Sequence, residues 1–261
     1  SGGAALATDD SGLATFAALS VDVSGSKRLV ASSGVPATSE PVPPKRESSL
    51  VTSLAAVASE LFTVSAGPAA ALVFVQQPSA TAAGATITPA VTVRVRDTFG
   101  NGVPGAPVAL ALVGSGTLNG SSVVASDGNG LATFATLSVD LAGSKQLVAA
   151  SGALAPVSSS AFAVTAGAAA ALAFEQQPSE VVAGMIITPA VTVRVRDAQG
   201  NGVAGVPVTL DLEGRGTLSG GTATPSDSNG LATFAALSVD IAGVKRLTAS
   251  SGALGPVSSD P

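Results

Sequence analysis

The sequence repeats itself at a spacing of one hundred residues. The segment NGLATFATLSVDLAGSKQLVAASG begins at Asn129, and NGLATFAALSVDIAGVKRLTASSG begins at Asn229. A second block, AAALVFVQQPS from Ala69, returns as AAALAFEQQPS from Ala169. Both blocks recur at the same offset, so the repeating unit has the size of a domain, far above the roughly 20–50 residues of a solenoid turn. The chain is therefore predicted to be a row of similar domains.

A further copy of the first block, SGLATFAALSVDVSGSKRLVASSG, begins at Ser11, so the sequence starts inside a repeat. We expect residues 1–66 to be the second half of an incomplete repeat and residues 67–165 to be a complete one. Residues 166–261 should lack a last strand, because SSSAFAVTAG from Ser158 has no counterpart after Ser259. We expect the chain to be a segment of a longer protein.

An insertion at about 35–52, VPATSEPVPPKRESSLVT, interrupts the first unit. Its prolines and its Lys45-Arg46-Glu47 cluster predict an extended, solvated loop of polyproline type. Because added loop length costs little free energy, a tolerated surface insertion explains the segment. A recognition loop at the tip of a domain is the alternative.

Apolar side chains recur with a period of two, which predicts half-buried β-strands. Apolar and polar residues alternate in VTVRVR from Val91 and in VTLDLE from Val208. The inward set changes phase between Phe134 and Leu137, so a bulge or bend is expected there. Further inward faces are predicted at Leu72 and Phe74, at Leu147 and Ala149, and at Phe162 and Val164.

Turn residues separate these strands. DTFGNG from Asp97 and DAQGNG from Asp197 contain residues that tolerate positive φ, and DGNG from Asp127 precedes the LATF strand. The Ala-rich run 168–172 lacks a helix cap and is assigned to a strand. About seven short strands per hundred residues, without a convincing helix, predict an all-β fold of tandem antiparallel β-sandwiches.

The composition excludes several classes of function. The chain contains no His and no Cys, so ordinary zinc or copper sites, His-activated nucleophiles and disulfides are excluded. A net charge of −5 with few basic residues argues against nucleic-acid binding. No run approaches the roughly 18 apolar residues of a membrane span. A Ser-Lys pair or a carboxylate pair is the catalytic chemistry left open.

The ordered motifs QQPS, ITPAVTVRVRD, GNGV and NGLATF resemble the bacterial immunoglobulin-like repeats of invasin and intimin. The resemblance covers nearly the whole chain outside the insertion. It implies tandem immunoglobulin-like sandwiches, about seven strands each, of the kind that form stalks of bacterial surface proteins. Receptor contacts in that family usually lie in a distinct terminal domain, so the resemblance assigns no binding residue here.

Six recurring aspartates could suggest calcium binding. Calcium takes six to eight oxygen ligands, usually from several carboxylates in one loop, whereas each turn here offers one. We therefore expect Asx-type turns, in which the side-chain oxygen binds nearby backbone amides. The junction 164–168 contains no acid, which argues against a joint stiffened by calcium. The six aspartates are Asp97, Asp127, Asp140, Asp197, Asp227 and Asp240.

Paired arginines on one strand face form another candidate site. We expect a solvated face with carboxylates on the neighbouring strand, and an anion or glycan contact is the alternative. The residues are Arg94, Arg96, Arg194 and Arg196.

Two remaining sets of charged residues are candidates for a covalent crosslink and for acid/base catalysis. A lysine recurs five residues after an aspartate, as Lys27, Lys145 and Lys245 after Asp22, Asp140 and Asp240. A Lys–Asn isopeptide crosslink needs a buried lysine beside an asparagine and an acid, and because the asparagines lie in turns none is expected. Glu175 and Glu180 lack counterparts in the preceding unit, so an acid/base pair is not expected. No catalytic, cofactor-binding or metal-binding residue is expected.

The leading hypothesis is a non-catalytic stalk or spacer segment of an extracellular or cell-surface bacterial repeat protein, namely an adhesin. Its expected partners are the neighbouring repeats, with an unknown protein or glycan receptor. The alternatives are an accessory region of a secreted multidomain enzyme, and a filament subunit assembled by strand donation through unpaired sheet edges.

Overall fold

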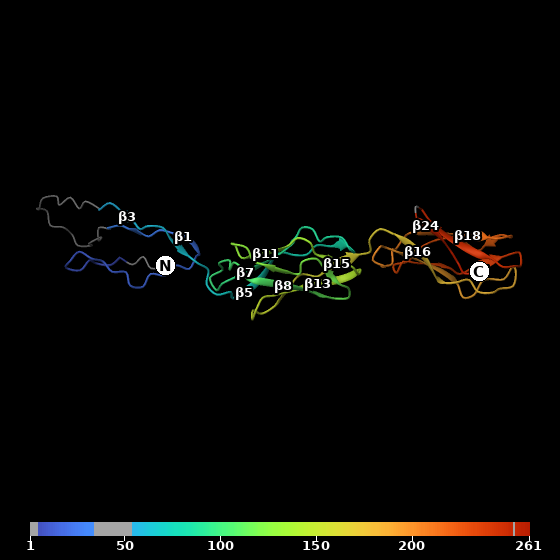
Figure 1. Ribbon diagram of the computed structural model, residues 1–261, viewed down its shortest axis with the longest axis horizontal. Helices are drawn as coiled ribbons and strands as arrows, with labels where there is room; N and C mark the ends of the chain where they lie inside the picture. Colours follow the sequence, from blue (N-terminus) through green and yellow to red (C-terminus); the bar gives the residue numbers. More distant parts are fainter. Residues whose placement is uncertain (1–4, 34–53, 253) are drawn as a thin grey trace, which may run out of the picture.

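The computed structural model describes residues 5–33, 54–252 and 254–261. The expected insertion at 35–52 lies outside these residues. The described parts contain strands and turns but no helix, and accordingly no helix that could span a membrane. The chain runs along one long axis, from a small N-terminal unit through a middle unit to a C-terminal unit (Figure 1).

The middle unit contains two main sheets, as predicted for a sandwich. The first is antiparallel in the order β11 (Leu131–Phe134), β7 (Val91–Arg96), β5 (Ala71–Gln76). The second follows the order β10 (Val123–Ala125), β8 (Pro107–Val113), β13 (Gly143–Ala150), β15 (Phe162–Thr165), β6 (Thr81–Ala82), with β14 (Val157–Ser158) also on β13. A small ribbon joins β9 (Leu118–Asn119) to β12 (Ser138–Val139).

The C-terminal unit repeats this arrangement. One sheet has the order β16 (Ala171–Gln176), β17 (Val191–Arg196), β21 (Leu231–Phe234). The other has the order β20 (Ala223–Pro225), β18 (Pro207–Glu213), β23 (Arg246–Ser251), β24 (Leu254–Ser258), and β19 (Leu218–Ser219) pairs with β22 (Ser238–Val239). Among its described residues, no strand corresponds to β6 or β15.

The N-terminal unit contains two short antiparallel ribbons. One pairs β1 (Gly25–Lys27) with β4 (Phe62–Val64), and the other pairs β2 (Val30–Ala31) with β3 (Val57–Ala58). Gly25 lies opposite Val64, as Gly143 lies opposite Val164 in the middle unit. The sequence repeat therefore reproduces a strand register.

Alternating side chains fill two separate cores. The valines predicted to face inward from 91–96 are fully buried between the sheets. At the predicted phase change, Phe134 and Leu137 are both buried, because the chain leaves β11 there and joins β9 through β12. The predicted bend is thus a switch between sheets. The most buried residues of the middle core are Val91, Val93, Val95, Val108, Phe134, Leu137, Leu147 and Ala149.

Candidate functional site at the repeat joints

The turn after β7 is organised around the Asp97 carboxylate. Its Oδ1 accepts hydrogen bonds from the backbone N–H of Phe99 (2.9 Å) and of Asn101 (2.8 Å), which is the expected Asx-type turn. Its Oδ2 accepts two more, from the backbone N–H of Gly67 (2.9 Å) and from Asn101 Nδ2 (2.9 Å). Gly67 lies in the segment between β4 and β5, so this carboxylate ties the incoming chain to the turn.

Asn101 extends the same turn to the preceding unit. Its Nδ2 donates to the Asp22 carbonyl (2.8 Å), and its Oδ1 accepts from the Ser24 backbone N–H (2.8 Å). The side-chain amide therefore has two donated bonds and one accepted bond, all to the protein. We call Asp97 with Asn101, and Asp197 with Asn201, the Asp–Asn clips.

The second clip has the same geometry. Asp197 Oδ2 accepts from Gly167 N–H (2.8 Å) and from Asn201 Nδ2 (2.9 Å). Asn201 donates to the Asp140 carbonyl (2.9 Å) and accepts from Ala142 N–H (2.8 Å). Asn201 is only 5 % exposed, so in the closed joint its side chain depends on these protein partners and not on water.

The segment between the units is short at this joint. β15 ends at Thr165 and β16 begins at Ala171, which leaves residues 166–170, all Ala or Gly. The segment itself contains no acid, as the sequence shows. An acid nevertheless contacts it from outside, because Asp197 in the turn after β17 accepts a hydrogen bond from Gly167 N–H.

Hydrogen bonds keep the clip carboxylates ionised. The Asn101 amide, together with the backbone amides of Gly67, Asn101 and Phe99, lowers the pKa of Asp97 from 3.8 to about 2, although burial opposes this shift. For Asp197 burial is the largest single influence and disfavours the charge, but the bonds from Gly167 and Asn201 outweigh it and the pKa is still lowered.

The other predicted aspartates have structural partners. Asp127 Oδ1 accepts from the N–H groups of Asn129 and Leu131, as an Asx-type turn should, and Asp227 does the same. Asp140 differs from the expectation. Its Oδ1 binds the N–H of Thr117, which is distant in sequence, and Asp240 binds Thr217 likewise. In the described parts of the chain, no three acidic side chains converge on one point.

The paired arginines have different partners in strand β7 and in its repeat counterpart β17. Arg194 forms a fork with Glu175, as expected for a carboxylate on the neighbouring strand: Nη2 donates to Oε1 at 2.9 Å, and Nε donates to Oε2. This bond lowers the pKa of Glu175. Position 75 in the preceding unit is Val, and within the part of the chain that the structure describes Arg94 forms no ion pair.

The recurring lysines are not equivalent. Lys145 is 2 % exposed, and its ammonium lies 3.3 Å from the Ala142 carbonyl and 3.5 Å from Ser115 Oγ. Lys27 and Lys245 are half-buried. Lys145 therefore holds the loop at Ala142, whose carbonyl accepts from the lysine and whose backbone N–H donates to Asn201. Among the described residues, its ammonium makes no hydrogen bond to an asparagine.

Sequence reasoning missed the bridging role of the two asparagines. It placed Asn101 and Asn201 in turns and stopped there. A signal was present, because Asp and Asn are retained in DTFGNG and DAQGNG while the two residues after Asp change. The Asx turn accounts for the Asp and uses only the backbone N–H of Asn101, so the retained Asn side chain indicated a further role.

Comparison with known proteins gives a family for part of the chain. The model of the bacterial Ig-like domain (group 1) family matches residues 171–259. No curated protein matches the chain.

Several solved structures have a similar arrangement at low identity. The D0–D1 domain of intimin is 21 % identical, with 74 % of this chain and 96 % of that chain covered and a TM-score of 0.30. The Escherichia coli adhesin FdeC is 20 % identical, with 77 % of this chain and 67 % of that chain covered and a TM-score of 0.41. Invasin, described as a bacterial integrin-binding protein, is 20 % identical, with 73 % of this chain and 38 % of that chain covered and a TM-score of 0.34. Glycoside hydrolases are also among the matches.

The C-terminal unit matches the bacterial Ig-like domain (group 1) family over residues 171–259, and the middle unit has the same strand order in its two main sheets.

Proposed function

We propose that this chain is a non-catalytic spacer: a stalk segment of a bacterial adhesin or similar repeat protein that is secreted or held at the cell surface. Its units are residues 1–66, 67–165 and 166–261, and the partner of each unit is its neighbour in the chain. The presence of adhesins among the similar structures supports a surface location.

The observation that supports this role most is the Asp–Asn clip at both joints. A spacer must resist bending, and bending at a joint would separate Asn201 from the Asp140 carbonyl and the Ala142 amide. Each buried polar group left without a partner costs about 1–3 kcal/mol. Because the same clip recurs at Asn101, each added repeat would bring its own stiff joint.

Removal of both clip amides tests the proposal. We expect the double variant Asn101→Ala, Asn201→Ala to keep two folded sandwiches but to bend at the joints. Small-angle scattering should give a shorter maximum dimension and a broader distance distribution than for the unchanged chain, which should scatter as an extended particle.

A matched control uses Asn129→Ala with Asn229→Ala, because these asparagines also precede a glycine in a turn but, among the described residues, bond only within their own unit. This control should keep the extended profile. A compact profile for the unchanged chain, or identical profiles for clip variant and unchanged chain, would refute the spacer role.

A further inference from the structure

Arg94 differs from its repeat counterpart in what surrounds its guanidinium. Arg194 is satisfied by a carboxylate that contacts Nε and Nη2. Among the described residues, Arg94 makes no hydrogen bond and no ion pair, and its Nε is buried without a partner. Val75 occupies the place of Glu175 and is 59 % exposed. The middle unit thus keeps the arginine and lacks the acid.

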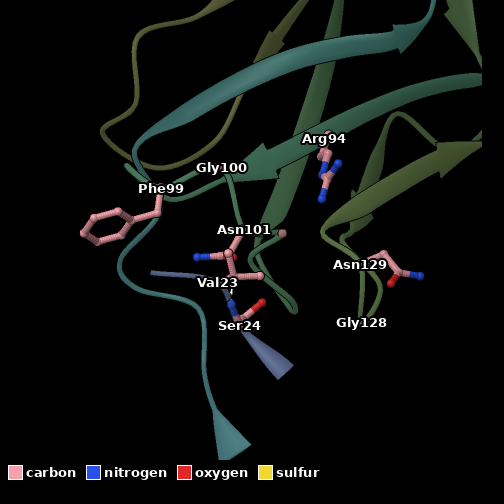
Figure 2. Close-up of a pocket in the computed structure, with 9 residues that line it drawn as sticks. Val23, Ser24, Arg94, Phe99, Gly100, Asn101, Gly128 and Asn129 are labelled. Atoms are coloured by element: carbon pink, nitrogen blue, oxygen red, sulfur yellow. Dashed lines mark hydrogen bonds between the residues drawn. The ribbon is translucent and has the colours of Figure 1, made fainter. Parts of the chain in front are cut away.

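A cavity adjoins this arginine at the first joint. It has a volume of about 380 Å³ and is lined by residues of the N-terminal unit and by two turns of the middle unit. Figure 2 shows the Arg94 guanidinium directed toward the space between Asn101 and Asn129, with Ser24 on the opposite side. This volume lies within the roughly 300–1,000 Å³ typical of small-ligand pockets.

The groups around the cavity suit a small, hydroxylated acid. Arg94 supplies a positive charge and, because Nε is covered, offers its terminal nitrogens to a ligand. A guanidinium binds a carboxylate in a planar, two-bonded geometry. Asn129 and Ser24 add an amide and a hydroxyl, which pair with neutral hydroxyl groups. Asn101 is already committed to the clip.

We propose that this cavity binds an acidic sugar of the uronic-acid class, with the sugar carboxylate on Arg94 and its hydroxyls facing Asn129 and Ser24. The third unit provides the internal precedent, since its arginine at the same position already holds a carboxylate. The inference requires the first joint to be closed, because Ser24 lines the cavity from the N-terminal unit, but it does not require the chain to act as a spacer.

The experiment titrates the isotope-labelled full chain with sodium glucuronate at constant ionic strength and follows backbone amide signals by NMR. Glucose and sodium acetate serve as parallel probes for the hydroxyls and the carboxylate alone. We expect saturable shifts at Ser24, Gly100 and Asn129 with glucuronate. Acetate should bind at least about tenfold more weakly, and glucose more weakly still, because each lacks one set of contacts.

Substitutions at the exposed position 75 avoid disturbing the core. Val75→Glu should supply the carboxylate found in the third unit, neutralise Arg94 and weaken glucuronate binding at least about tenfold. Val75→Leu should leave binding unchanged, and Arg94→Gln should abolish it. The proposal fails if glucuronate produces no saturable shift, if glucose or acetate binds equally well, or if Val75→Glu binds like the unchanged chain.

Discussion

Asn101 and Asn201 link units because an amide side chain has donors and an acceptor at the same tip. In Asn101 the side-chain nitrogen donates to a backbone carbonyl of the preceding unit and to the Asp97 carboxylate of its own unit. The side-chain oxygen accepts a hydrogen bond from a backbone N–H of the preceding unit. A serine or an aspartate cannot reproduce that set, since one lacks a second donated bond and the other has no donor when ionised. The geometry therefore specifies asparagine.

Gly102 follows the first clip and shows how closely the two turns approach. A Cβ placed on it would lie 2.0 Å from the Asn129 carbonyl oxygen, which is backbone and cannot swing aside. We predict that Gly102→Ala destabilises the middle unit by about 1–3 kcal/mol, the usual cost of overpacking. Chemical denaturation followed by circular dichroism would measure the loss.

Gly128 is the matched control for this substitution. A Cβ there would meet nothing within 4 Å, and the backbone is not in the left-handed region. Gly128→Ala should stay within about 0.5 kcal/mol of the unchanged chain. Equal destabilisation by the two alanines would show that contact with the Asn129 carbonyl is not the cause.

Strand positions could be predicted from the sequence because burial in a sandwich follows a period of two. The valines at 91, 93 and 95 and the apolar residues of 208–210 are buried as that period requires. The phase change after Phe134 likewise located a bend. The pattern could not show that this bend transfers the chain to a different sheet, since the partner strand β9 is known only from long-range pairing.

The joints were less predictable for a related reason. Hydrogen bonds such as that from Asn201 to the Asp140 carbonyl depend on how one unit docks on the next, and no local periodicity encodes docking. Lys145 is a second example. Nothing in its local sequence indicated burial, yet its aliphatic stem passes close to Gly114, where a side chain would crowd it.

The last strand of the middle unit illustrates what one element contributes. In β15, Phe162 is 5 % exposed and seals the core beside β13. The C-terminal unit has no described counterpart of β15, and a cavity of about 780 Å³ lies along Gly243–Lys245, the positions that correspond to the β15-binding part of β13. The strand therefore closes an otherwise open edge of the sandwich.

We predict that Phe162→Ala destabilises the middle unit by about 3–5 kcal/mol, as expected when a buried Phe is truncated. Hydrogen exchange at the β13 amides, with calorimetry of the whole chain, would measure the change. Phe62→Ala is the repeat-matched control, because Phe62 lies in the same register on β1 but is 37 % exposed. Phe62→Ala should lower the free energy of unfolding clearly less than Phe162→Ala does. An equal loss would mean that the burial of Phe162 in β15 does not cause the destabilisation.

At the scale of the whole molecule, the two clips place charge-dependent bonds at each joint. The pKa of Asp97 is lowered when the chain is folded, so its ionised form stabilises the folded arrangement. That contribution is complete above the ordinary aspartate pKa of 3.8 and is lost as the pH falls toward about 2. Asp197 shifts in the same direction. Acid should therefore loosen the joints.

We predict that the chain stays extended at neutral pH and bends more freely between pH 3.8 and about 2, as the Asp97 carboxylate takes up a proton. Small-angle scattering across this range would follow the maximum dimension, with circular dichroism to confirm that the strands persist. The double variant Asp97→Asn, Asp197→Asn should already bend at neutral pH, because an amide cannot accept four donated bonds as the carboxylate does. Asp127→Asn with Asp227→Asn changes the same kind of turn away from the joints and should stay extended until the pH falls. If both double variants bend alike at neutral pH, flexibility arises from turn stability in general and the clips do not set the shape of the molecule.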